Sequence, residues 1–175
     1  MPARKRILIV YYSLGGNTQR VAKDLAAHLG ADLQRLRERT NRRGFRGYVR
    51  AAFDSLRERP ASLIHVARDV AGYDLVIVGT PIWVGRITPA VRTYLESIRG
   101  RARHIAFFTT SGDTGIDRVL PAMHRFVDQE PIASVGLSAR ELADAACYEN
   151  KLTAFLNGVR PLAPRMGREL VHAHA

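Results

Sequence analysis

Two glycines and three short polar side chains stand together near the start of the chain, at Gly15, Gly16, Ser13, Asn17 and Thr18. Hydroxyl and amide groups of this kind hydrogen-bond to anionic oxygens, and glycine lets the backbone approach a ligand closely. A helix that follows such residues adds free N–H groups and a favourable dipole. The pattern predicts a phosphate-binding loop without a lysine. The alternative is an ordinary strand-to-helix turn in which Asn17 or Thr18 caps the helix.

A strand and a helix must hold this loop in place. Residues 7–12 form an unbroken run of β-branched, aliphatic and aromatic residues, which predicts a strand buried on both faces of a sheet. Beyond the loop the apolar residues change to helical spacing. They are Val21, Ala22, Leu25, Ala26 and Leu29. The opening unit is therefore expected to run strand, loop, helix.

Two later segments, residues 80–86 and 110–115, combine polar residues with glycine after a predicted strand, and both are expected to be loops. The first contains the only tryptophan, Trp83, whose flat apolar surface could pack against a planar ring. The alternative for Trp83 is a core anchor for the next helix or a protein contact. The second contains Asp113, which could hydrogen-bond to a ligand or, alternatively, form an Asx turn or cap a helix.

Strands and helices are expected to alternate along the rest of the chain. Further strands are predicted at residues 31–36, 73–79, 103–110 and 132–137, and helices at 45–56, 88–98, 116–127 and around 152–156. This alternation predicts an α/β fold with a five-stranded parallel sheet, which suits the strand order 2-1-3-4-5 with helices on both faces. The three loops then follow neighbouring strands and converge on one cleft. We expect one domain from residue 1 to 160 and a C-terminal tail from 161 to 175.

The opening unit resembles the flavodoxin signature. The residues that carry the resemblance are Ile9, Val10, Tyr11, Ser13, Gly16, Thr18, Ala22 and Leu25. The resemblance implies a single-domain flavodoxin-like protein that binds flavin mononucleotide (FMN), with the phosphate in the first loop and the isoalloxazine ring covered by the segment that contains Trp83. The cofactor-binding residues that it implies are Ser13, Leu14, Gly15, Gly16, Asn17, Thr18, Pro81, Ile82, Trp83, Val84, Gly85, Thr110, Ser111, Gly112 and Asp113.

The sequence departs from the flavodoxin pattern in two ways. Its third segment has no aromatic residue to stack on the flavin, so one face of the ring is expected to be open or covered by another segment or subunit. An open face suits hydride transfer or a small substrate better than single-electron transfer. The carriers of this family are typically acidic near the flavin, whereas Arg86 would place a positive charge beside the ring and favour the anionic reduced form.

The resemblance implies a redox protein in which the cofactor performs the chemistry. Two roles stay open: an electron carrier with an acidic protein partner, and a small flavin-dependent reductase of the NAD(P)H:quinone reductase or protoporphyrinogen oxidase kind. No catalytic residue is singled out, because His65, His104 and His124 lie on or beside regular elements, as structural histidines do. The alternative function is a flavodoxin-fold binding or regulatory module that has lost flavin.

Composition limits the partners. The formal net charge is +11 and the isoelectric point is near 10.8, which predicts attraction to anionic partners. The arginines are spread along the chain without interleaved aromatics, so we expect a basic solvated surface rather than specific nucleic-acid binding. No apolar run has the length of a membrane span, and Cys147 is the only cysteine. A cytoplasmic protein without a disulfide or a metal site is expected.

Overall fold

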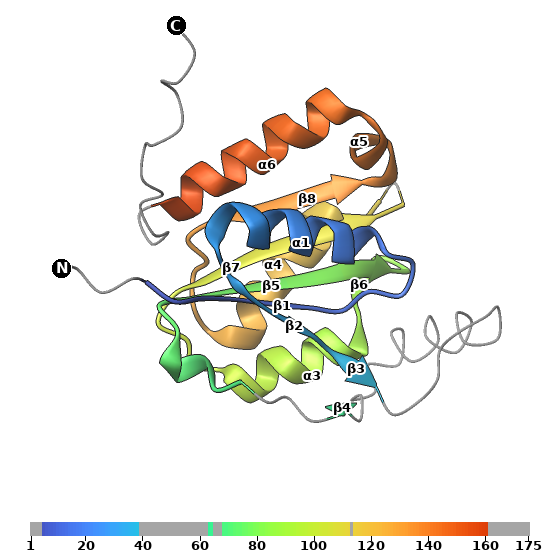
Figure 1. Ribbon diagram of the computed structural model, residues 1–175. Coiled ribbons are helices and arrows are strands. Elements are labelled where there is room, and N and C mark those ends of the chain that lie inside the picture. Colours follow the sequence, from blue (N-terminus) through green and yellow to red (C-terminus); the bar gives the residue numbers. More distant parts are fainter. Residues whose placement is uncertain (1–4, 39–62, 65–67, 113, 161–175) are drawn as a thin grey trace, which may run out of the picture.

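The computed structural model describes residues 5–38, 63–64, 68–112 and 114–160. Five parallel strands form the central sheet in the order β2-β1-β5-β7-β8, which confirms the predicted order (Figure 1). The strands are β1 (Ile7–Tyr11), β2 (Asp32–Arg35), β3 (Arg37–Glu38), β4 (Leu63–Ile64), β5 (Leu75–Trp83), β6 (Arg86–Ile87), β7 (Ile105–Ser111) and β8 (Ser134–Ser138). The helices are α1 (Asn17–Leu29), η1 (Val70–Gly72), α3 (Pro89–Ile98), α4 (Ile116–Val127), α5 (Ala139–Ala143) and α6 (Ala145–Val159).

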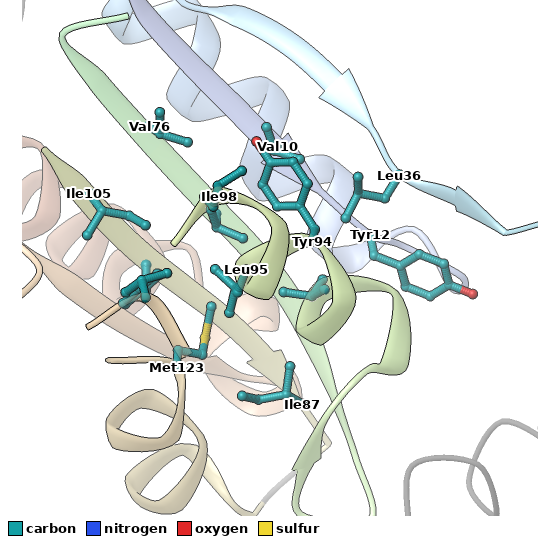
Figure 2. Packing of buried hydrophobic residues seen from close by; sticks show 14 of the residues in the cluster. Val10, Tyr12, Leu36, Val76, Ile87, Tyr94, Leu95, Ile98, Ile105 and Met123 are labelled. Atoms are coloured by element: carbon teal, nitrogen blue, oxygen red, sulfur yellow. The ribbon is translucent and has the colours of Figure 1, made fainter. Parts of the chain in front are cut away.

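Helices cover both faces of the sheet, as the alternation of strands and helices predicts. Successive residues of a strand point to opposite faces. Val10 and Val76 therefore face α3 and α4 in one buried cluster, where they join Tyr94 and Met123 (Figure 2). Residues at alternate positions, such as Ile9, form a second buried cluster with side chains of α1 and α6. Both faces of the strands are thus buried, which explains their nearly continuous apolar sequences.

Two glycines of the sheet make room for large side chains. A Cβ atom at Gly79 of β5 would overlap the ring of Phe108 on the neighbouring strand β7. A Cβ atom at Gly136 of β8 would overlap the side chain of Ile116 at the start of α4. Both glycines leave the space that a large neighbouring side chain occupies.

Strand β5 is longer than the sequence predicts. Thr80 and Pro81 continue its pairing with β7, and Ile82 and Trp83 pair with the antiparallel strand β6. The prediction of a loop at residues 80–86 is therefore wrong for residues 80–83 and for Arg86, which begins β6, because partner strands extend the ladder. What is left is a tight turn at Val84 and Gly85, with φ angles of 51° and 67°, as in two-residue hairpin turns.

Two further differences follow later in the chain. The strand predicted at residues 103–110 also includes Ser111, so the third loop begins at Gly112 and not at Thr110. The helix α5 is not predicted because its five residues are too few to show helical spacing; it starts with a capping box between Ser138 and Glu141. The helix predicted at residues 45–56 and the tail predicted from residue 161 lie outside the described residues.

Candidate functional site

The first loop is built around two buried hydroxyl groups. Ser13 and Thr18 are buried, and Ser13 Oγ accepts a hydrogen bond from the backbone N–H of Gly16 at 3.2 Å. Gly16 is the N-cap of α1 with a φ angle of 99°, a conformation that glycine adopts readily. A Cβ atom at Gly15 or Gly16 would meet no atom within 4 Å, so the outer side of the loop is open.

The geometry of this loop differs from an ordinary capped turn. Asn17 is the first residue of α1, and no side chain makes the capping hydrogen bond at its N-cap. The alternative in which Asn17 or Thr18 caps the helix is therefore wrong. The first N–H groups of a helix lack partners within the helix, and they favour an anion. The loop thus has the open space and the donors that a phosphate group needs.

Three contacts bring the predicted loops together. The side chains of Thr18 and Thr110 share a buried hydrogen bond of 2.8 Å, which joins the start of α1, just after the first loop, to the end of β7, just before the third. The backbone N–H of Tyr12 donates to the carbonyl oxygen of Gly79 at 3.1 Å, which joins the residue after β1 to the middle of β5. A Cβ atom at Gly115 would lie 3.0 Å from Cα of Gly85, so the second and third loops are also in close contact. The convergence expected from the strand order is present.

Trp83 does not stand at the tip of a loop. It is the last residue of β5, its side chain is only 7% exposed, and its ring packs edge-on against Tyr12 with the ring centroids 5.5 Å apart. Val84, at the tip of the turn, is 52% exposed instead. This burial favours a packing role for Trp83, which was the alternative to direct contact with a planar ligand.

The third segment presents a buried polar atom without a partner. Ser111 is 8% exposed, and its Oγ atom has no hydrogen-bond partner within the described part of the chain. Buried hydroxyl groups are nearly always satisfied, so an unpaired one at the end of β7 fits a bound polar ligand. Gly112 is held by a 2.9 Å hydrogen bond from the N–H of Ala139 to its carbonyl oxygen. Asp113 lies outside the described residues.

Arg35 is a site residue that the sequence analysis missed. Its Nη2 atom donates to the backbone oxygen of Ser13 at 2.7 Å, which fixes the start of the first loop and places a positive charge beside it. The predicted pairing of the first two strands could have indicated this residue. In a parallel pair, Arg35 of β2 lies opposite Tyr11 at the end of β1, next to the first loop. Reading the positions beside the loop on the neighbouring strand would have found it.

The described histidines are bound to neighbouring groups away from the three loops. The His124 ring stacks on Phe107 with the centroids 5.6 Å apart, and His104 hydrogen-bonds to the backbone oxygen of Asp74 at 3.0 Å; His65 lies outside the described residues. Cys147 is half-buried. Across the described ranges, no cluster of three or more potential metal ligands occurs, and no helix has both the length and the apolar composition to cross a membrane.

Together, the sheet order and the three joined loops define a doubly wound α/β protein with its candidate site at the switch point between β1 and β5, where such folds bind ligands. The family follows from comparison with known proteins. The chain belongs to the flavodoxin family, because the family model described as Flavodoxin matches residues 6–157. No curated protein matches the sequence significantly.

Solved structures with the same fold include several flavoproteins. A flavoprotein in complex with FMN from Lactobacillus acidophilus has 21% sequence identity and a TM-score of 0.63, with 79% of this chain and 97% of that chain covered. A protein of Bacteroides eggerthii described as a flavoprotein has 20% identity and a TM-score of 0.68, with 90% and 99% covered. The flavodoxin, WrbA-like protein from Agrobacterium tumefaciens has 16% identity and a TM-score of 0.58, with 90% and 95% covered. At these identities the likeness establishes the fold.

Proposed function

We propose that the chain binds FMN in the cleft formed by the three loops and works as a redox protein, with the flavin ring as the group that takes up and releases electrons. The observation that carries this proposal is the first loop. Its open outer side, its buried Ser13 hydroxyl and the N-terminus of α1 suit a phosphate group. The structure of an FMN complex with the same fold adds support.

Each loop has its own part in this proposal. Residues 13–18 would hold the phosphate, with Arg35 fixing the loop from β2. Thr110 and Ser111 would offer hydroxyl groups to the cofactor, and Asp113 follows them in the same segment. The turn at Val84 and Gly85 would border the ring, while Trp83 packs against Tyr12 at the same end of the sheet.

The first experiment is to purify the protein without added cofactor, record its visible spectrum, and titrate FMN while following flavin fluorescence and the fluorescence of Trp83, the only tryptophan. We expect a yellow protein or saturable binding of FMN. A colourless protein that does not respond to FMN would contradict the proposal and favour a binding or regulatory module with this fold.

A matched pair of glycine variants tests where FMN binds. Gly16 and Gly100 both have positive φ angles, 99° and 68°, and a Cβ atom at either would meet nothing within 4 Å. Gly16→Ala and Gly100→Ala should therefore lose similar amounts of stability, roughly 1 kcal/mol each from backbone strain. Only Gly16→Ala should weaken FMN binding, by about tenfold or more, because strain there distorts the anion-binding loop. Equal FMN affinity in the two variants would place the cofactor elsewhere.

The two redox roles differ in their partners. A reductase oxidises a reduced nicotinamide without help, whereas a carrier needs a partner protein, which the charge of +11 predicts to be acidic. Steady oxidation of NADPH by the isolated, FMN-loaded protein with a quinone as acceptor would identify a reductase. No turnover under these conditions, with rapid reduction by a flavoprotein reductase, would identify a carrier.

We further propose a cytoplasmic location, which cell fractionation tests.

A further inference from the structure

A cavity of about 480 Å³ lies between α3 and α4, beside the β5–β6 turn. Half of its ten lining residues are arginines: Arg86, Arg92, Arg99, Arg118 and Arg125. None of the ten carries a carboxylate, and the others are apolar residues or glycine. The cavity therefore combines a high density of positive charge with an apolar floor.

The guanidinium groups come from separate elements. Arg118 and Arg125 stand two turns apart on one side of α4, so both reach the cavity from exposed positions. Arg99, directly after α3, donates from Nε and Nη2 to the carbonyl oxygens of Phe126 and Arg125, both at 2.9 Å. Arg92 is buried, with 9% of its surface exposed. The lining thus combines a buried arginine, an arginine anchored by two hydrogen bonds, and exposed arginines of α4.

The like charges of Arg99, Arg118 and Arg125 around one cavity repel one another, and an anion would offset that repulsion. Arginine guanidinium groups match phosphate oxygens with paired N–H donors. A phosphate group brings up to two negative charges in a small volume, and a carboxylate brings only one. In a cavity of about 480 Å³, phosphates therefore supply the compensating charge with the fewest atoms. We propose that this cavity binds a small compound that carries two or more phosphate groups. The proposal goes beyond FMN binding and does not rest on it.

Inorganic pyrophosphate is the probe, titrated calorimetrically into the purified protein. The test variant is Arg118→Gln with Arg125→Gln, and the control is Arg140→Gln with Arg160→Gln, which removes the same charge at exposed positions away from the cavity. We expect the dissociation constant to rise about tenfold or more in the test variant relative to the control. Equal affinities in the two would overturn the proposal. The unfolding midpoint without ligand verifies that both variants fold.

One additional variant and one additional condition separate this cavity from the phosphate loop and from general charge effects. Ala122→Glu places a carboxylate in the cavity wall and should also abolish pyrophosphate binding. Protein saturated with FMN has its phosphate loop occupied and should bind pyrophosphate in the cavity with unchanged affinity. Loss of pyrophosphate binding on saturation with FMN but not in Ala122→Glu would overturn the proposal, because the probe would then occupy the loop.

Other ligands define what kind of phosphate compound the cavity takes. ADP carries the same diphosphate with an attached ring system, and tighter binding than pyrophosphate would show that the apolar floor of Ile87, Val119 and Phe126 takes part. Equal binding of ADP and pyrophosphate would identify the diphosphate alone as the ligand. Both outcomes support a phosphate site. Binding of a single-stranded oligonucleotide without binding of pyrophosphate would overturn it in favour of a nucleic-acid surface.

Discussion

At the scale of single residues, the candidate site depends on hydroxyl groups that lie far apart in the sequence. Thr18 and Thr110 are separated by 92 positions, yet their side chains share a buried hydrogen bond of 2.8 Å. A hydroxyl group buried without a partner costs more than a paired one contributes. The pair therefore stabilises the relative position of α1 and β7, which border the first and the third loop.

A double-mutant cycle measures this coupling. Thr18→Val and Thr110→Val each leave one buried hydroxyl group without its partner and should each lower the free energy of unfolding by about 1–3 kcal/mol. The double variant removes both groups, so its loss should be smaller than the sum of the single losses by about 1 kcal/mol. Urea unfolding of the four proteins gives the values. Simple additivity would mean that the hydrogen bond contributes nothing.

At the scale of elements, one glycine of β5 makes room for a large ring of the neighbouring strand β7. The ring of Phe108 occupies the space beside Gly79, whereas the nearest atom to a Cβ at Gly72 is an arginine nitrogen at 3.6 Å. Gly79→Ala should therefore lower the free energy of unfolding by about 1–3 kcal/mol through overpacking. Gly72→Ala, the matched control, should change it by less than about 1 kcal/mol. Similar losses in the two variants would contradict the steric explanation.

The third loop depends on the short helix α5. Glu141 caps that helix by accepting from the N–H of Ser138 at 2.8 Å, and its Oε1 lies 2.7 Å from Lys151 Nζ on α6. Lys151 also donates to the backbone oxygen of Gly136. The hydrogen bond from Lys151, followed by the one from the Ser138 N–H, holds the pKa of Glu141 below its ordinary value. The charged form of Glu141 is therefore the form that the folded protein favours.

This lowered pKa predicts a pH dependence of stability. A carboxylate whose pKa is lower in the folded state stabilises the protein above its unfolded pKa, and the stabilisation is lost as the pH falls through the folded value. At pH 7, Glu141→Gln should be less stable than the wild type by about 0.5–1 kcal/mol, since the pair is partly exposed. The difference should shrink below about pH 4. Glu149→Gln, at an exposed position of α6, is the control and should show a smaller change.

At the scale of the whole molecule, the net charge of +11 sets the electrostatic field in which a bound flavin would work. Arg86 lies in β6, directly after the turn that borders the proposed flavin site. A positive charge near the ring favours the anionic reduced flavin, so its removal should make reduction harder. A unit charge about 8 Å away at an effective dielectric constant of about 20 contributes roughly 2 kcal/mol.

Arg86→Glu should therefore lower the midpoint potential of bound FMN by at least about 45 mV for a two-electron couple, before screening by salt. A spectroscopic redox titration measures the potential. Arg140→Glu makes the same change of charge on α5 and should shift the potential less. An unchanged potential in Arg86→Glu would contradict the placement of Arg86 beside the ring.

The sequence by itself determined the fold, its strand order and its family. Unbroken apolar runs and helical spacing are local properties, and they sufficed for the five parallel strands and for the loops that end at one edge of the sheet. Gly16 and Ser13 could be predicted as parts of a phosphate-binding loop, because glycine lets the backbone approach a ligand closely and a small hydroxyl side chain offers a hydrogen-bonding group there.

Only the tertiary structure decided which side chains meet. The extension of β5 to Trp83, the burial of that ring against Tyr12 and the contact of Arg35 with the first loop all depend on neighbouring strands. The arginine cavity joins residues of a turn and two helices, from Gly85 to Phe126. Such contacts depend on how close the layers pack and on which rotamers fit, and neither is encoded in the local pattern of apolar and polar residues.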